Sequence, residues 1–342
     1  MERKGTVKEK TAKKTDLNNK SELKKRNNPR KTNRKEANQI NKRESKAQSN
    51  GEVLFEKQFP RDELLSSSFN GKRRTNKFEF KKDNLKIIPL GGLDEIGKNI
   101  TVFEYGNEIV LVDCGLEFPE DDMLGIDLVI PDVTYLEKNK DKIKGMVVTH
   151  GHEDHIGAIP YVLKQINMPI YATKLTVGLI KNKLEEHKLL ASTKLVTVEQ
   201  GQTINFGNIK VEFIRSSHSI PDSVMLAIHT PVGVVLHTGD FKVDFTPIDD
   251  QVMDLGRIAE LGNKGILALM SDSTNSERKG YTMSEKSIGP VFDKLFEGCK
   301  KRIVVATFAS NVHRVQQIVN SAVKFGRKIA VSGRSMINMI EA

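Results

Sequence analysis

The chain has 342 residues, 38% of them hydrophobic, which allows two domains and a sizeable buried core. Its net charge of +10 excludes a uniformly acidic protein, but the excess is confined to one end. Residues 1–50 carry 17 Lys and Arg against 6 Asp and Glu, whereas the other 292 residues carry 37 against 38.

Residues 1–83 are predicted to form a disordered basic extension. The first 50 are rich in Lys, Asn, Ser and Thr, have few apolar residues and show no period, so they cannot bury enough surface to fold alone. Such an arm can attract phosphate groups, or it can be a solvated extension without a role. The sequence leaves both interpretations open.

Several features predict a cytoplasmic protein that does not enter a membrane. The N-terminal stretch lacks the apolar segment of a secretory signal, and its Glu residues argue against an organellar transit peptide. No apolar run is long enough to span a bilayer. Cys114 and Cys299 lie far apart without metal-site spacing, which indicates reduced thiols.

From residue 84 the sequence predicts three consecutive strands, at residues 85–90, 99–105 and 108–112. The third strand runs into Asp113, which places a carboxylate at a strand end. Asp113 could be a simple turn residue. We favour a role in catalysis, in which Asp113 orients a ligating imidazole through its free ring nitrogen.

The segment from Thr149 to His155 holds three imidazoles and two carboxylates and is the most informative part of the chain. A predicted helix at 131–140 and a buried strand ending at Val148 precede it. In an extended segment His150 and His152 share a face, so both can reach one metal ion. Asp154 and His155 follow the turn at Gly151 and would face a second ion. Imidazole and carboxylate ligands without thiolate predict two Zn²⁺ ions, with Mn²⁺ possible.

Two later residues are predicted to complete this centre. After helices at 156–167 and 173–188, strands are expected at 195–198, 209–215, 224–230 and 233–237. His218 follows the second of these strands and could complete the first ion's ligands. Asp240 follows the last strand and could bridge both ions. The remaining histidines lack ligand spacing and are interpreted as structural: His187, His229, His237 and His313.

After Asp240 the pattern alternates between helix and strand, which predicts a parallel sheet covered by helices. Helices are expected at residues 252–261, 284–300 and 312–325, and strands at 265–270, 303–306 and 328–332. Asp272 lies at a strand end in the run Ser-Asp-Ser-Thr-Asn. On its own, such a run is usually a helix N-cap.

The His-Gly-His-Glu-Asp-His motif at 150–155, with Asp113 before it and His218 and Asp240 after it, resembles the metallo-β-lactamase superfamily. Four further stretches, at residues 87–99, 113–119, 155–161 and 271–275, are similar to bacterial ribonuclease J of the β-CASP branch of nucleases. The resemblance covers roughly residues 84–342.

The resemblance implies an αββα sandwich with the start of an inserted α/β β-CASP domain. The expected boundaries are 84–250 for the N-terminal part of the sandwich and 251–342 for an incomplete β-CASP domain. The implied activity is metal-dependent hydrolysis of RNA, both endonucleolytic and 5′-to-3′ exonucleolytic, in RNA maturation and decay. A metal-activated water would be the nucleophile, Asp240 would hold both ions, and Asp154 could accept the water's proton.

The implied partner is single-stranded RNA, expected to be 5′-monophosphorylated, which would enter between the two domains. Arg314 is a candidate RNA contact, and so is Ser310, which is also expected to cap the following helix. The intact protein is expected to be a homodimer or homotetramer. The two later His motifs of the family, one of which supplies the remaining ligand of the second ion, do not occur before Ala342, and the general acid is expected to be a later His of the family. We therefore expect the chain to be an N-terminal fragment.

Two other hypotheses remain open. The first is a metallo-β-lactamase-fold hydrolase of a thioester, lactam or lactone. The α/β segment after Asp240 argues against it, because small substrates require no such insertion. The second is an RNA-binding piece without activity, which the basic extension and the incomplete ligand set of the second ion favour.

Overall fold

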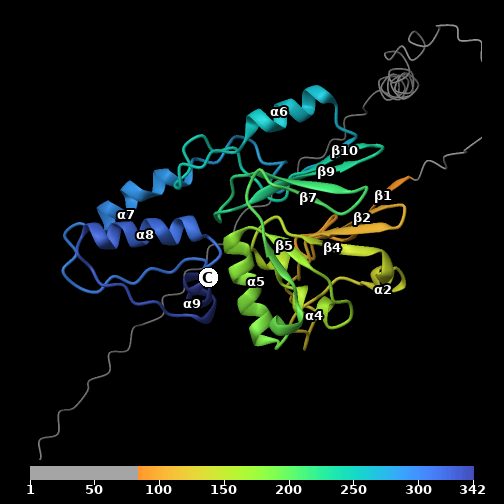
Figure 1. Ribbon diagram of the computed structural model, residues 1–342. Helices are drawn as coiled ribbons and strands as arrows, with labels where there is room; N and C mark the ends of the chain where they lie inside the picture. The colour runs from red at the N-terminus through yellow and green to blue at the C-terminus, as the bar shows by residue number, and fades with distance from the viewer. Residues whose placement is uncertain (1–83) are drawn as a thin grey trace, which may run out of the picture. The chain divides into compact units, whose positions relative to one another are not determined.

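The computed structural model describes residues 84–342, so the predicted basic extension at residues 1–83 lies outside the described part. Two β-sheets pack face to face in the described part, with helices on their outer faces (Figure 1). The predicted αββα sandwich is confirmed.

The first sheet has the strand order β1-β2-β3-β4-β5-β6. Its strands are β1 (Leu85–Gly91), β2 (Ile100–Tyr105), β3 (Glu108–Val112), β4 (Ile143–Val147), β5 (Ile170–Ala172) and β6 (Leu195–Thr197). The first three pair antiparallel, as tight connections allow, and β3 to β6 pair parallel through helical crossovers.

The second sheet has the order β11-β10-β9-β8-β7. Its strands are β7 (Thr203–Asn205), β8 (Lys210–Arg215), β9 (Val224–Thr230), β10 (Gly233–His237) and β11 (Ala268–Met270). β7 to β10 form an antiparallel meander, and β11 adds parallel to β10.

Alternation along the central strands explains the layers. In β3, Ile109 and Leu111 face the helices, whereas Val110 and Val112 face the second sheet. Phe213 of β8 packs between the sheets with these valines and is fully buried. A strand that is apolar on both faces requires a covering layer on each side. Helices cover one face of β3, and the second sheet covers the other.

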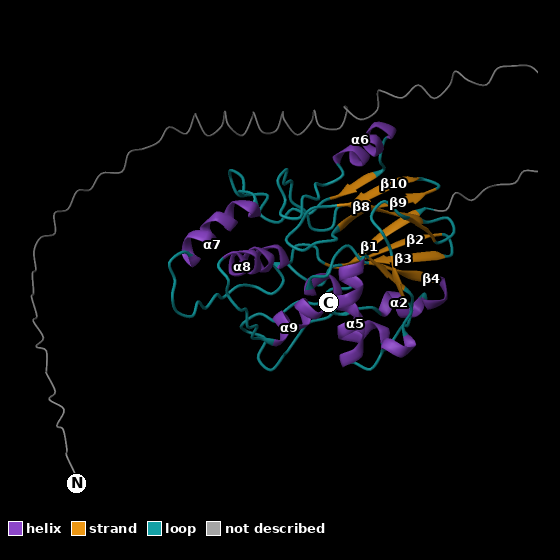
Figure 2. Ribbon diagram, turned by 60° about the vertical axis from the view of Figure 1, so that its left-hand side comes forward, coloured by secondary structure: helices purple, strands orange, loops and turns teal. Residues whose placement is uncertain are grey.

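The outer layers are helical. The helices α2 (Thr134–Lys138), α4 (Ile159–Leu163) and α5 (Lys174–Glu186) cover the first sheet, and α6 (Leu255–Lys264) covers the second (Figure 2). The short helix α3 (Glu153–Ile156) directly follows the histidine-rich turn. Within residues 84–342, three short 3-10 helices connect other elements: η1 (Lys140–Lys142), η2 (Leu190–Ser192) and η3 (Glu285–Ile288).

The prediction of one continuous helix at 156–167 is wrong. The structure breaks it between α3 and α4, because the backbone N–H of Ala158 donates to Cys114 O at 3.0 Å instead of continuing the helix. The helix predicted at 131–140 is shorter and forms only α2. The strands β5 and β7, of three residues each, were not predicted.

The last third also departs from the prediction. After α6, its helices are α7 (Gly289–Phe296), α8 (Val312–Lys324) and α9 (Arg334–Glu341), the last of which was not expected. The strands predicted at 303–306 and 328–332 are wrong, since neither segment joins a ladder in the described part of the chain. Strand propensity alone does not make a strand, because the backbone needs a pairing partner.

Within residues 84–342, no helix combines the length and apolar character that crossing a bilayer requires.

Glu104 in β2 ties the first sheet to α2. It is 3% exposed and accepts hydrogen bonds from the Tyr135 hydroxyl, from Lys142 Nζ at 2.9 Å and from Lys86 Nζ at 3.2 Å. Burial alone would raise the pKa of Glu104, but these three donors together hold it below its usual value of 4.5.

We expect Glu104→Gln to lower the free energy of unfolding at pH 7 by about 1–3 kcal/mol, because hydrogen bonds to a charged group are lost. The folded-state pKa lies below the unfolded one, so this contribution is complete above the unfolded value and disappears as the pH falls through the folded value. Urea unfolding should therefore show the difference at pH 7 and a smaller one at about pH 3. Glu137→Gln, at an exposed position of α2, is the control. A difference independent of pH would contradict this account.

Candidate metal centre

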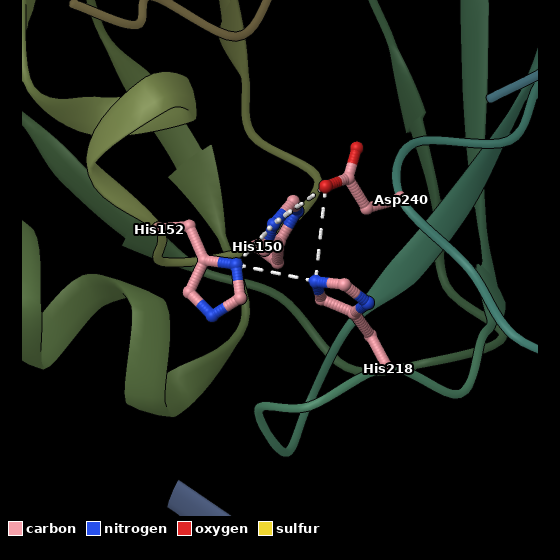
Figure 3. Close-up of side chains that lie close together, drawn as sticks. All are labelled: His150, His152, His218 and Asp240. Carbon is pink, nitrogen blue, oxygen red and sulfur yellow. Dashed lines mark hydrogen bonds and ion pairs between the residues drawn. The ribbon is translucent and has the colours of Figure 1, made fainter. Parts of the chain in front are cut away.

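Strand ends deliver the predicted ligands to one edge of the sandwich. β4 ends at Val147, and His152, which has φ −77° and ψ 154°, is the N-cap residue of α3. The rings of His150 and His152 meet here, as their alternate spacing predicted. His218 lies in the loop after β8, and Asp240 follows β10, so the second sheet contributes the other two side chains (Figure 3).

Four of these side chains surround one point. His152 Nδ1 lies 3.1 Å from His150 Nε2 and 3.2 Å from His218 Nε2. Asp240 Oδ2 lies 3.7 Å from His218 Nε2 and 3.9 Å from His150 Nε2. A tetrahedral zinc ion with bonds of about 2.0–2.1 Å holds its ligand atoms about 3.3 Å apart. The observed spacings lie close to this value, so the group fits one ion.

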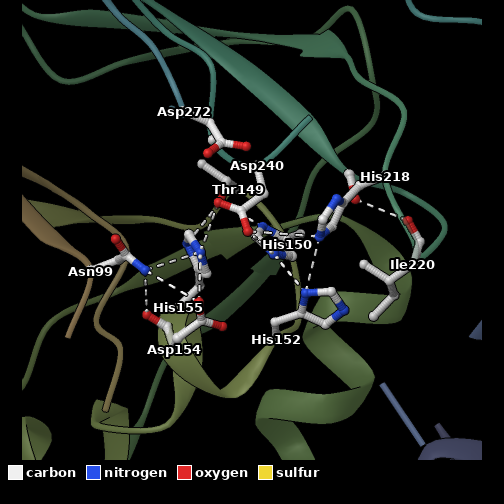
Figure 4. Close-up of polar contacts among 12 residues, drawn as sticks. Asn99, Thr149, His150, His152, Asp154, His155, His218, Ile220, Asp240 and Asp272 are labelled. Atoms are coloured by element: carbon white, nitrogen blue, oxygen red, sulfur yellow. Dashed lines mark hydrogen bonds and ion pairs between the residues drawn. The ribbon is translucent and has the colours of Figure 1, made fainter. Parts of the chain in front are cut away.

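A second group shares Asp240. His155 Nε2 lies 3.3 Å from Asp240 Oδ1 and 3.6 Å from Asp154 Oδ2. The two oxygens of Asp240 therefore face different groups, as expected of a bridging carboxylate. Asn99 was not predicted as a site residue, yet its Nδ2 lies 3.2 Å from His155 Nε2 and donates to the Asp154 carbonyl at 3.1 Å (Figure 4).

Asp113 positions the candidate ligands through hydrogen bonds. It is 1% exposed, its φ is 60°, and its carboxylate accepts hydrogen bonds from Thr149 N at 2.8 Å and from Thr149 Oγ1 at 2.9 Å. Asp113 Oδ2 also lies 2.8 Å from His155 Nδ1. The contact turns the ring so that Nε2 faces Asp240 and Asp154. Thr149 Oγ1 in turn lies 3.0 Å from His150 Nδ1.

The imidazoles differ in protonation. Burial lowers the pKa of His150, His152 and His218, and for His218 the value is about 4. These rings are therefore neutral at pH 7, the form that binds a metal. Burial would also lower the pKa of His155, but Asp113 and Asp240 raise it well above the usual value. Asp113 lies at Nδ1 of this ring and Asp240 at Nε2, so a cation bound at Nε2 would replace the proton there and balance the charge of Asp240 in its place.

Asp240 is also held in its charged form. Burial would raise its pKa, but the hydrogen bond and charge of His155 and the charges of the other imidazoles lower it to about 2. Asp240 is thus a carboxylate throughout the neutral range, as a bridging ligand must be.

Two backbone hydrogen bonds, together called the backbone clamp, fix the position of α3. Cys114 N donates to His155 O at 2.8 Å, and Leu116 N donates to Glu153 O at 3.2 Å. Between them, a Cβ on Gly115 would lie 1.5 Å from the Asp154 carbonyl oxygen. Only glycine permits this approach, which fixes both Asp154 and His155.

The two predicted RNA contacts are placed differently. Ser310 lies beside the centre, with its carbonyl oxygen 3.1 Å from His152 Nε2. It does not cap α8 as expected, because Asn311 is the N-cap residue and accepts from Arg314 N at 3.0 Å. Arg314 itself forms a bidentate pair with Glu285, at 2.7 and 2.9 Å. Contact with RNA stays a prediction for both residues.

The histidines interpreted as structural lie outside both ligand groups. His237 Nδ1 accepts from Gly239 N at 3.1 Å, and His229 Nε2 lies 3.1 Å from Glu212. Asp272 lies beside the Asp240 loop, where Phe241 N donates to it at 3.5 Å (Figure 4).

The chain is similar to two families of known proteins. The metallo-beta-lactamase superfamily matches residues 93–266, and the beta-CASP domain of ribonuclease J matches residues 300–342. The sequence is 57% identical to Ribonuclease J of Synechocystis sp. over 75% of this chain and 40% of that protein. It is 52% identical to Ribonuclease J 1 of Streptococcus pyogenes, over 75% of this chain and 46% of that protein. The resemblance that the motifs predicted is confirmed.

The chain spans less than half the length of these relatives. Ribonuclease J2 of Bacillus subtilis gives the same picture, with 45% identity over 76% of this chain and 47% of that protein. Among solved structures, a protein of unknown function from Enterococcus faecalis has a TM-score of 0.54 at 17% identity, over 73% of this chain and 71% of that chain. This last similarity concerns the fold alone.

Substituting one candidate ligand at a time should show which of the two metal ions depends on it. We expect His218→Ala to lose one metal ion of two, because it belongs to the first group alone, and Asp240→Ala to lose both, because both groups share it. Elemental analysis after loading and desalting measures the stoichiometry. His187→Ala, outside both groups, should retain two ions. Equal loss in His218→Ala and Asp240→Ala would contradict a shared carboxylate.

Gly115→Ala should displace α3. We expect it to lower the free energy of unfolding by about 1–3 kcal/mol, because a backbone carbonyl must move, and to reduce occupancy of the ion at Asp154 and His155. Thermal unfolding and metal content test this. Gly262→Ala in α6, where an added Cβ meets no atom within 4 Å, is the matched control. Full metal content in Gly115→Ala would rule out the clamp.

Proposed function

The chain belongs to the metallo-β-lactamase superfamily, and we propose that it is the N-terminal part of a metal-dependent ribonuclease of the ribonuclease J type. The convergence of His150, His152, His218 and Asp240 with Asp154 and His155 is the observation that carries the proposal. The names and similarity of the relatives support RNA as the substrate.

The donor set fits two divalent cations. His150, His152 and His218 would hold one, Asp154 and His155 the other, and Asp240 both. Three imidazoles with one carboxylate suit Zn²⁺, and the more oxygen-rich second group also suits Mn²⁺. When bound, the ions supply a water of lowered pKa and neutralise charge on a scissile phosphate.

The chain's own residues arrange this chemistry. Asp113 orients His155, and Thr149 links Asp113 to His150, so the rings are set before substrate binds. The Asp154 side chain is 33% exposed, which lets it accept a proton from the attacking water and pass it to solvent. Asn99 fixes the Asp154 backbone and thereby the direction of this carboxylate.

The finer assignments follow from the family resemblance. We propose single-stranded, 5′-monophosphorylated RNA as the substrate, with both endonucleolytic and 5′-to-3′ exonucleolytic cutting. We propose a cytoplasmic homodimer or homotetramer for the whole protein. The excess of 17 basic over 6 acidic residues in the first 50 supports an arm that attracts RNA phosphates.

Cleavage of a labelled single-stranded RNA by the whole protein, in Zn²⁺ or Mn²⁺, tests the function. We expect cleavage that falls at least about 100-fold in Asp154→Asn, because a ligand of the second ion and a proton acceptor are lost together. A 5′-monophosphate substrate should be cut faster than a 5′-triphosphate one. Asp141→Asn, which removes an exposed carboxylate in η1, is the charge-matched control. A chain that binds two ions and hydrolyses a thioester or lactam but not RNA would contradict the proposal.

A further inference from the structure

One ligating ring differs from the others in its surroundings. Metal-binding histidines almost always donate their second ring N–H to a carboxylate, a carbonyl or a water. The other three imidazoles of the centre have a polar partner at the second nitrogen: the Asp113 carboxylate, the Thr149 hydroxyl and the Ser310 carbonyl. For His218, the contacts among residues 84–342 involve Nε2, and its second nitrogen points away from the cluster (Figure 3).

A polar cavity of about 200 Å³ adjoins His218. Two buried polar atoms in its wall, Ser216 Oγ and His313 Nε2, have no hydrogen-bond partner within the described part of the chain. Both residues are 5% exposed. Leaving such atoms unsatisfied costs free energy, so each points to an occupant of the cavity.

The other polar groups that line the cavity show which of them is free to accept a hydrogen bond, through water, from the second ring nitrogen of His218. Asp222 accepts a backbone hydrogen bond at 3.2 Å, and Gln251 accepts from a guanidinium at 3.3 Å. Asp249 Oδ1 accepts from Gln251 N at 3.1 Å. Asp249 Oδ2 lies 3.5 Å from His313 Nε2, too far for a good hydrogen bond. Burial also lowers the pKa of His313, so no imidazolium neutralises this carboxylate at pH 7.

The polar groups that line the cavity favour water as its occupant. Among residues 84–342, no Lys or Arg lines the cavity and two carboxylates do, which disfavours an anion. Donors and acceptors are mixed, which suits a molecule that both donates and accepts. A water takes a volume of about 30 Å³ and makes about three hydrogen bonds, so the cavity has room for several.

We propose that this cavity is a hydration site in which ordered water links the His218 Nδ1–H to Asp249 Oδ2, with Ser216 and His313 as further contacts. Asp249 is then a positioning residue. Through the water its charge keeps the proton on Nδ1 and leaves the Nε2 lone pair for the metal. This role rests on the proposed metal centre, whereas the hydration of the cavity does not.

Metal affinity tests the positioning role. In a Co²⁺ titration, Asp249→Ala should bind the ion at His218 about 10-fold more weakly than the parent chain and change its visible absorption. Asp249→Asn keeps an oxygen acceptor and should recover most of the affinity. Asp250→Asn is the charge-matched control, since Asp250 pairs with Lys286 outside the cavity. Parental affinity and spectrum in Asp249→Ala would overturn the role.

Thermal unfolding without added metal tests the hydration separately. If Ser216 Oγ bonds to water, Ser216→Ala should lower the Tm by about 2–4 °C. If the hydroxyl is simply unsatisfied, its removal should leave the Tm unchanged or raise it, which would overturn the hydration site. Ser271→Ala, at an exposed position, is the control. A parent chain that binds no Co²⁺ would overturn the metal centre and the role of Asp249, and the Ser216 result would still decide whether the cavity is hydrated.

Discussion

The buried carboxylate of Asp113 is the interaction on which the arrangement of the centre depends. It ends β3, anchors Thr149 after β4 and holds the ring of His155. A buried carboxylate is costly unless it is fully hydrogen-bonded, and here backbone, hydroxyl and imidazole donors satisfy it. The same contacts that make its burial possible therefore orient two of the candidate ligands. Asp113 therefore contributes both to the stability of the sheet edge and to the geometry of the centre.

The sandwich explains why the ligands come from distant parts of the chain. β3 and β4 belong to the first sheet, and β8 and β10 to the second, yet the loops after all four strands meet. Apolar residues on both strand faces force the sheets together, and their packing fixes the separation of these loops. His218 and Asp240 reach the histidine turn only because this core is formed.

The segment after the sandwich also reaches the centre. The carbonyl of Ser310 lies beside His152, and His313 N donates to Ser219 O at 3.3 Å. The proposed water site lies at this contact, with walls from the loop that carries His218 and from the start of α8. The α/β segment thus contributes to the surroundings of the candidate metal ligands.

The sequence by itself determined the candidate ligands, because alternation in an extended segment and a turn into a helix are local properties of residues 150–155. It also placed His218 and Asp240 at strand ends. Only the tertiary structure revealed the contacts of Asn99 with Asp154 and of Ser310 with His152, which join residues 55 and 158 positions apart. It also decided that residues 303–306 and 328–332 are not strands, although their composition favours them. A strand needs a partner, and pairing depends on which backbones meet in the folded chain.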